Sequence, residues 1–212
     1  MEHLLAFVHF FLHIDQALSQ VIQDHGAWTY AILGVVIFCE TGLVVTPFLP
    51  GDSLLFAAGA FAAKGDLSVG VLFFILSVCG ILGDSVNYGI GASMGPAVFD
   101  RPDSRVFKKE YLVKTAAFFE RYGAKTIVIA RFVPIVRTFA PFVAGVGSMD
   151  YRVFLRWNVL GGLLWVGICL FAGYFFGNLA FVQENFSLVI LAIIFISVLP
   201  AVIETWRARR TS

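Results

Sequence analysis

The chain has 212 residues, of which 59% are hydrophobic and 14% are charged, and its mean hydropathy is +0.86. A soluble domain needs roughly a quarter of its residues charged, so this composition excludes a soluble enzyme, a disordered chain and a secreted disulfide scaffold, and it predicts an all-α polytopic membrane protein. The formal net charge of +1 offers no basic field for nucleic acid, and the sequence contains neither a P-loop for ATP nor a Cys-x-x-Cys pair for a metal.

Residues 1–26 are predicted to form an N-terminal amphipathic helix. They contain three acidic residues but no lysine or arginine, whereas a signal peptide requires a basic start. Apolar residues recur at helical spacing, and polar residues gather in the second half of the segment. Such a helix either lies on the membrane surface or crosses the membrane as a poor first span.

Residues 27–63 are predicted to form the first broken segment. An apolar run ends near Glu40, and Pro47, Pro50 and Asp52 precede the next apolar run. Proline removes a backbone amide and clashes with the preceding turn. Broken backbone within a bilayer is tolerated only where protein or a water-filled cavity covers it. The segment is therefore predicted to be a re-entrant hairpin, or a span followed by one.

The middle of the chain contains one apolar stretch and one basic stretch. Residues 67–95 are apolar over the length of a transmembrane helix. Residues 100–125 hold seven lysines and arginines with aromatic residues between them, which predicts a cytoplasmic loop with a basic amphipathic helix. The aromatic interleaving also suits contact with anionic lipid head groups.

Residues 126–147 are predicted to form a second re-entrant segment, because Arg131, Pro134, Arg137 and Pro141 interrupt an apolar run. The two apolar runs that follow are predicted to be transmembrane helices, at 151–177 and 186–206.

The order of hairpin and span, interrupted by the basic loop, indicates two repeats of one architecture. The sequence echo is weak, with Ala58-Gly59 in the first half and Ala144-Gly145 in the second. Paired interrupted segments in corresponding halves point to a transporter site near the midplane, and two unrelated kinked helices are the alternative. If the basic loop and the basic C-terminal tail are both cytoplasmic, the repeats are inverted and the two re-entrant hairpins are opposed.

Five charged residues fall within these apolar segments: Glu40, Asp52, Asp84, Arg131 and Arg137. A charge at the bilayer centre costs about 2.5–3.5 kcal/mol, so each should pair or face water. Arginine stays protonated and fits phosphate oxygens bidentately, which makes the two arginines candidate head-group ligands, assisted by amides that the nearby prolines free. A desolvated carboxylate can exchange a proton near neutral pH, which makes Glu40 and Asp52 candidates for proton coupling.

Each of these charges also has a structural alternative, namely an ion pair that holds the hairpins together. Asp84 and Tyr88 are four residues apart on one helix face, so they could simply satisfy each other. Asn158 and Trp165 are expected to serve helix packing and interfacial anchoring. The small-residue spacing after Gly83 permits a homodimer without requiring one.

Five short motifs in this order resemble the DedA family, and the resemblance runs from about residue 14 to 207. The motifs are Phe38-Cys-Glu40-Thr-Gly42, Pro47-Phe-Leu-Pro50-Gly51-Asp52-Ser53, Gly83-Asp84-x-x-Asn87-Tyr88, Ala130-Arg131-Phe-x-Pro134-x-x-Arg137-Thr-x-x-Pro141-x-x-Ala144-Gly145 and Phe154-x-x-x-Asn158-x-x-Gly161-x-x-x-Trp165.

The resemblance implies a multi-pass protein of the bacterial inner membrane that moves lipid phosphates, and the basic tail predicts a cytoplasmic C-terminus. The expected cargo is undecaprenyl phosphate or a phospholipid such as phosphatidylethanolamine, with dependence on the proton-motive force and no cofactor. The resemblance implies that Glu40 and Asp52 are the essential acidic pair and that Arg131 and Arg137 are the essential arginines. The expected supporting residues are Asp84, Tyr88, Asn158, Pro50, Gly51 and Pro134.

Three other classes of function are alternatives to a lipid translocase. A proton-coupled antiporter of small cations or drugs would use the same carboxylates and keep the arginines as structural partners. A lipid phosphatase is disfavoured because all four histidines lie in the first 25 residues and no metal cluster is evident, so no enzymatic activity is expected. In a purely structural membrane protein, Glu40 and Arg131 would only pair with each other.

Overall fold

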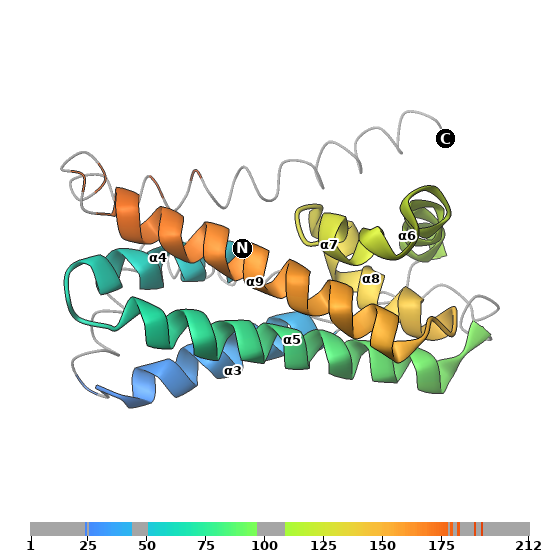
Figure 1. The fold of residues 1–212 in the computed structure, drawn as a ribbon, viewed down its shortest axis with the longest axis horizontal. Coiled ribbons are helices and arrows are strands. Elements are labelled where there is room, and N and C mark those ends of the chain that lie inside the picture. The colour runs from blue at the N-terminus through green and yellow to red at the C-terminus, as the bar shows by residue number, and fades with distance from the viewer. Residues whose placement is uncertain are drawn as a thin grey trace, which may run out of the picture. The chain divides into compact units, whose positions relative to one another are not determined.

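A computed structural model describes residues 24, 26–43, 51–96 and 109–177, together with residues 179, 182, 189 and 192. The regular structure of these residues is helical (Figure 1). The predicted N-terminal helix over 1–26 and the predicted last span over 186–206 lie outside the described residues, apart from isolated positions, and so does the basic C-terminal tail.

The structure describes α3 (Trp28–Gly42) and α4 (Gly51–Ala63) on the two sides of the first predicted break, and residues 44–50 between them lie outside the described residues. The C-terminus of α4 is closed by Gly65, whose φ of +93° suits glycine. The amide of Asp66 donates to the carbonyl of Phe61 over 3.3 Å, and the amide of Gly65 donates to that of Ala62 over 3.1 Å. This pair of bonds satisfies carbonyls that would otherwise lack partners at the helix end.

Two long helices correspond to the predicted spans at 67–95 and 151–177. Helices α5 (Val69–Met94) and α9 (Tyr151–Phe176) have 26 residues each, and a helix of that length extends about 39 Å, more than the ~30 Å hydrocarbon core of a bilayer. Both are apolar enough to cross a membrane. Large apolar side chains such as Phe74 and Phe175 are about 70% exposed on them (70% and 69%), as lipid-facing residues would be.

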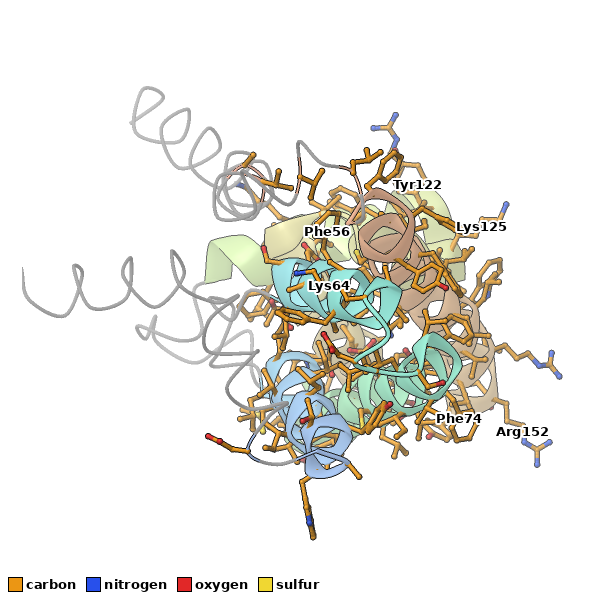
Figure 2. The ribbon with its side chains drawn as sticks, turned by 90° about the vertical axis from the view of Figure 1, so that its left-hand side faces the viewer. Phe56, Lys64, Phe74, Tyr122, Lys125 and Arg152 are labelled. Carbon is orange, nitrogen blue, oxygen red and sulfur yellow. The ribbon has the colours of Figure 1, made fainter. Side chains whose placement is uncertain are left out.

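The basic stretch contains an amphipathic helix, as predicted, in the part that the structure describes. Helix α6 (Lys109–Tyr122) continues into the short 3-10 helix η2 (Gly123–Lys125). Leu112 and Thr115 are buried on the inner face of α6, whereas Val113 and Arg121 are exposed. Lys125 points out from the packed side chains around it (Figure 2).

Within the second predicted broken segment, the helix is interrupted between α7 (Thr126–Ala130) and α8 (Pro134–Val146). Helix α8 is enclosed by apolar contacts on more than one side. Phe142 and Val146 pack in a cluster with Leu112 of α6. Ala140 and Ala144 pack in a second cluster that includes the side chain of Phe154 from α9.

The chain divides into two compact units, one of residues 1–35, 50–76 and 166–212 and one of residues 36–49 and 77–165. In the first unit, α4 packs closely against α9. A Cβ at Gly59 would collide with the carbonyl of Leu170, and a Cβ at Gly173 would collide with the carbonyl of Phe56. Glycine is therefore needed on both helices for this approach.

The second unit contains the same contact between α8 and α5. A Cβ at Gly145 would collide with the carbonyl of Tyr88, and a Cβ at Gly91 would collide with the carbonyl of Phe142. In both units the contacting phenylalanine precedes the glycine of its helix by three residues. The weak echo of Ala58-Gly59 in Ala144-Gly145 thus corresponds to one packing contact made twice, which supports two repeats of one architecture.

Candidate functional site

The buried charges of the second unit form two ion pairs. Asp84 of α5 accepts a hydrogen bond from Nη2 of Arg131, and Glu40, near the end of α3, accepts one from Nη2 of Arg137 on α8. Four of the five charges singled out in the sequence are therefore paired with one another. The structural hypothesis named Arg131 as the partner of Glu40, whereas the structure shows a hydrogen-bonded ion pair of Glu40 with Arg137.

The break before α8 places the first arginine. The amides of Arg131, Phe132 and Val133 donate to the carbonyls three residues earlier, over 3.3, 3.2 and 2.8 Å, which tightens the end of α7. Pro134 then forces the preceding residue out of the helical region, and Val133 is extended, with φ −119° and ψ 104°. Pro134 thereby starts α8 as a favoured first residue.

These hydrogen bonds correct one prediction. The amides near the break were expected to be freed by proline and to help bind an anion. Instead, the amides of residues 131–133 bond to local carbonyls, and the amide of Arg137 donates to the carbonyl of Val133 over 2.8 Å. Anion binding at these residues must therefore come from the guanidinium groups.

Arg131 is held on several sides. Its Nη2 atom donates to Oδ1 of Asn158 over 2.6 Å as well as to Asp84. The amide of Asn158 in turn donates to the carbonyl of Ile81 over 3.0 Å, which fixes its orientation. Gly161 leaves room for the arginine, since a Cβ there would lie 3.1 Å from both Cδ and Nε of Arg131. With 4% of its side chain exposed, Arg131 is locked in place.

Arg137 is the more accessible arginine. Its side chain is 18% exposed, whereas that of its partner Glu40 is 3% exposed. Four residues later stands Pro141, inside α8, and because proline has no N–H it cannot donate the usual helical hydrogen bond to the carbonyl of Arg137. Among the residues of the two ion pairs, Arg137 is the one that a ligand can reach most easily.

Trp165 lies under both arginines. The Cζ atoms of Arg131 and Arg137 are 5.6 and 5.3 Å from the centroid of its ring. The indole is 2% exposed, so the predicted role as an interfacial anchor is wrong. Its spacing of i, i+3, i+7 with Asn158 and Gly161 places all three on one face of α9, and that signal could have assigned Trp165 to the site.

Asn87 is a further residue of the site, for which the sequence predicted no role. Its Nδ2 atom donates to the carbonyl of Thr41 over 3.2 Å and to the carbonyl of Thr138 over 3.0 Å. It follows Asp84 by three residues on α5 and is fully buried. Asn87 therefore ties the end of α3 and the middle of α8 to α5 beside the ion pairs.

Tyr88 does not satisfy Asp84, so the prediction of a mutual pair is wrong. Its hydroxyl donates to the carbonyl of Met149 in the turn between α8 and α9, and its ring stacks on Phe154 with centroids 4.6 Å apart. The physical reason is that a buried carboxylate is stabilised far better by an arginine than by a hydroxyl. Tyr88 instead fixes a turn in which Ser148 adopts a φ of +54°.

Asp52 belongs to the first unit, where it lies half-buried in the first turn of α4, directly after Gly51. A carboxylate at this place interacts favourably with the helix dipole. Its part in proton coupling stays a prediction. Pro50, the residue before Gly51, lies outside the described residues.

The chemistry available to the second unit is the exchange of one anionic partner of an arginine for another. Two guanidinium groups and two carboxylates balance when all four are charged, and removing one charge leaves its partner uncompensated in an apolar surrounding. A phosphate could take the place of the carboxylate at Arg137. Within the described ranges, no group of three or more His, Cys, Asp or Glu side chains could hold a metal ion.

Comparisons with known proteins agree with the motifs. The model of the VTT domain matches residues 49–175. The chain is 52% identical to Protein DedA of Escherichia coli K12 over 100% of this chain and 98% of that protein. It is 48% identical to an uncharacterized membrane protein of Mycobacterium tuberculosis, over 84% of this chain and 80% of that protein. It is 31% identical to the inner membrane protein YghB of Escherichia coli K12, over 83% and 79%.

No solved structure matches this chain. The family model covers more than half of the chain, and Protein DedA is similar along its whole length. These matches, together with the two apolar helices of spanning length, show that the chain belongs to the VTT-domain, or DedA, family of membrane proteins.

Proposed function

We propose that this protein is a translocase that moves lipid phosphates across the bacterial inner membrane and depends on the proton-motive force. Undecaprenyl phosphate is the first candidate cargo, and a glycerophospholipid such as phosphatidylethanolamine is the second. In this proposal the protein is a carrier and not an enzyme. The broken segments α3–α4 and α7–α8 are re-entrant, and the basic loop around α6 and the C-terminal tail face the cytoplasm.

The observation that supports this proposal best is the ion pair of Arg137 with Glu40. The carboxylate is buried and the guanidinium is partly accessible. Protonation of Glu40 would weaken its hold on Arg137, so that a phosphate head group could bind the guanidinium. Return of the proton to solution would restore the ion pair and expel the phosphate. Proton uptake and lipid binding would thereby be coupled at one pair of residues.

The unit that carries this pair suits a lipid better than a free anion. The head group would bind at the arginines, while its apolar tail would remain among the exposed apolar side chains of the helices. Leu82 and Val86 of α5 and Leu160, Leu163 and Leu164 of α9 are all exposed apolar residues of the second unit. The tail would then stay in lipid, and only the charged head group would need the protein.

The test is reconstitution in proteoliposomes that contain labelled undecaprenyl phosphate, with and without an imposed pH gradient. The wild-type protein should move the lipid between leaflets, faster with the gradient. An Arg131→Ala/Arg137→Ala double variant should lose this movement, and Glu40→Gln should lose its dependence on the gradient. Arg156→Ala is the matched control, because Arg156 is exposed on α9, and it should resemble wild type.

Equal rates for the wild type and the double variant would refute the proposal. Movement of phosphatidylethanolamine in preference to undecaprenyl phosphate would select the second cargo. Release of inorganic phosphate from the lipid would show an enzyme instead of a carrier.

One observation favours the alternative of a proton-coupled antiporter for small cations or drugs. Both arginines of the candidate site, Arg131 and Arg137, already have a carboxylate partner, as a purely structural arginine would. In that case Arg137→Lys should be nearly neutral, and vesicles should show proton-coupled cation flux without lipid movement. In the lipid translocase, Arg137→Lys should reduce transport strongly, because lysine lacks the bidentate geometry that fits phosphate.

A further inference from the structure

We propose that Trp165 is the positioning residue of the paired arginines: its indole ring holds the guanidinium groups of Arg131 and Arg137 at one anion-binding site. Both Cζ atoms lie within 5.6 Å of the centroid of this one ring. The two arginines come from different places, one from the break after α7 and one from within α8. Trp165 of α9 is the described ring that both of them share.

Like charges at one site repel each other, so something must oppose the repulsion. Each arginine has its own hydrogen-bonded carboxylate, and Asp84 also attracts Arg137 electrostatically. Once Glu40 is protonated, however, Asp84 alone is left to balance the two cations. The face of an indole ring carries a negative quadrupole and is the strongest aromatic binder of cations. Because Trp165 is 2% exposed, water does not screen this attraction.

The ring lies beside α5 as well as on α9. A Cβ at Gly80 of α5 would be at ordinary van der Waals distance, 3.7 Å from Cζ3 of Trp165 and 3.8 Å from Cγ2 of Ile37, so α5 passes within one methyl group of the indole. On α9, Asn158 and Gly161 stand on the same face as Trp165, and they contact Arg131 directly. One face of α9 therefore positions Arg131 by a hydrogen bond and both arginines by the ring.

The ring matters most when Glu40 releases Arg137, a step that belongs to the proposed function, so this part of the inference rests on it. When a proton or a phosphate breaks that ion pair, the carboxylate no longer fixes the guanidinium. Trp165 still contacts Arg137 and keeps it beside Arg131. The site would then present two adjacent guanidinium groups to one head group. Without the ring, Arg131 would stay fixed and Arg137 would change its conformation freely.

The arrangement can be tested without any transport, by NMR of the arginine Nε–Hε groups in lipid nanodiscs. The signals of Arg131 and Arg137, assigned with Arg131→Lys and Arg137→Lys, should be shifted upfield by the ring current of Trp165. Trp165→Leu should remove both shifts, Trp165→Phe should keep part of them, and Phe154→Leu should leave them unchanged. Phe154 is a fair control because it is a buried ring of α9 that stacks on Tyr88. Unshifted arginine signals in the wild type would overturn the arrangement.

The electrostatic role can be tested by placing tryptophans with increasing fluorination at position 165. Fluorine weakens the quadrupole of the ring while nearly keeping its shape, so the KM for labelled undecaprenyl phosphate should rise stepwise, on the order of tenfold over the series, with little change in kcat. An unchanged KM over the series would mean that Trp165 only fills space, and the inference would fail. Shifted NMR signals in a protein that moves no lipid phosphate would refute the proposed function and leave the arrangement standing.

Discussion

Arg131 and Arg137 carry the same charge, but their surroundings give them different properties. Arg131 is bound by Asp84 and Asn158, and its side chain is 4% exposed. Arg137 donates to the carboxylate of Glu40, and its side chain is 18% exposed. Arg131 is therefore suited to a fixed charge in the site, and Arg137 to a charge that changes partners. Residue type alone could not separate the two roles, because the difference lies in tertiary neighbours.

This difference predicts unequal costs for removing the two carboxylates. Asp84→Asn keeps the size of the side chain but leaves the charge of Arg131 buried without a counter-charge, so we expect a loss of about 3–5 kcal/mol in the free energy of unfolding. Glu40→Gln should cost less, because the side chain of Arg137 is 18% exposed and that of Arg131 only 4%. Unfolding in mixed micelles measures both values.

A double variant makes the Asp84 prediction specific. Asp84→Asn combined with Arg131→Gln removes both charges, so it should be more stable than the sum of the single changes predicts. If Asp84→Asn costs no more than Glu40→Gln, or if the double variant is simply additive, the pairing of Asp84 with Arg131 is not important for stability.

At the scale of the elements, the interruption between α7 and α8 was predictable and the pairing of charges was not. Pro134 marks the start of α8 in the sequence because the residue before a proline avoids the helical region, and the structure shows Val133 extended there. The partners of the ion pairs are 47 and 97 residues apart, and no local spacing encodes such a distance. The spacing of four residues predicted a pair of Asp84 with Tyr88, because four residues make about one helical turn. Asp84 instead pairs with Arg131, whose full positive charge stabilises a buried carboxylate better than a hydroxyl does.

Helix α9 positions the site through small residues as well as through polar ones. A Cβ at Gly161 would lie 3.1 Å from Cδ and Nε of Arg131 and 3.3 Å from Cα of Val128. Gly161→Ala should therefore displace Arg131 and lower the free energy of unfolding by about 1–3 kcal/mol. It should also lower the rate of lipid transport. Thermal unfolding in detergent and the proteoliposome assay measure the two effects.

Gly89→Ala on α5 is the matched control for Gly161→Ala. A Cβ at Gly89 would meet nothing within 4 Å, and alanine favours the helix over glycine by roughly 0.5–1 kcal/mol. This variant should be neutral or slightly stabilising. If Gly161→Ala proved as harmless as Gly89→Ala, α9 would not be the element that positions Arg131.

At the scale of the whole molecule, the described residues of the two units show one helix contact made twice. In each unit a glycine of the short helix after a break lies against the main chain of a long helix, and a glycine of the long helix lies against a phenylalanine of the short one. The sequence hinted at this only through Ala58-Gly59 and Ala144-Gly145, because glycine pairs become informative only when their partners are known. We therefore expect this contact to contribute similarly to stability in the two units.

The repeat predicts that Gly59→Ala and Gly145→Ala have similar effects. Each new Cβ would collide with a main-chain carbonyl, of Leu170 or of Tyr88, and no side-chain rotation can relieve such a collision. We expect each variant to lose about 1–3 kcal/mol in the free energy of unfolding. Their costs should add in the double variant, because the two contacts belong to different units and share no residue. Gly70→Ala, which meets nothing within 4 Å, should be harmless. If one variant lost much of its free energy of unfolding and the other lost none, the two contacts would not be energetically equivalent. The repeat would then be one of backbone geometry only.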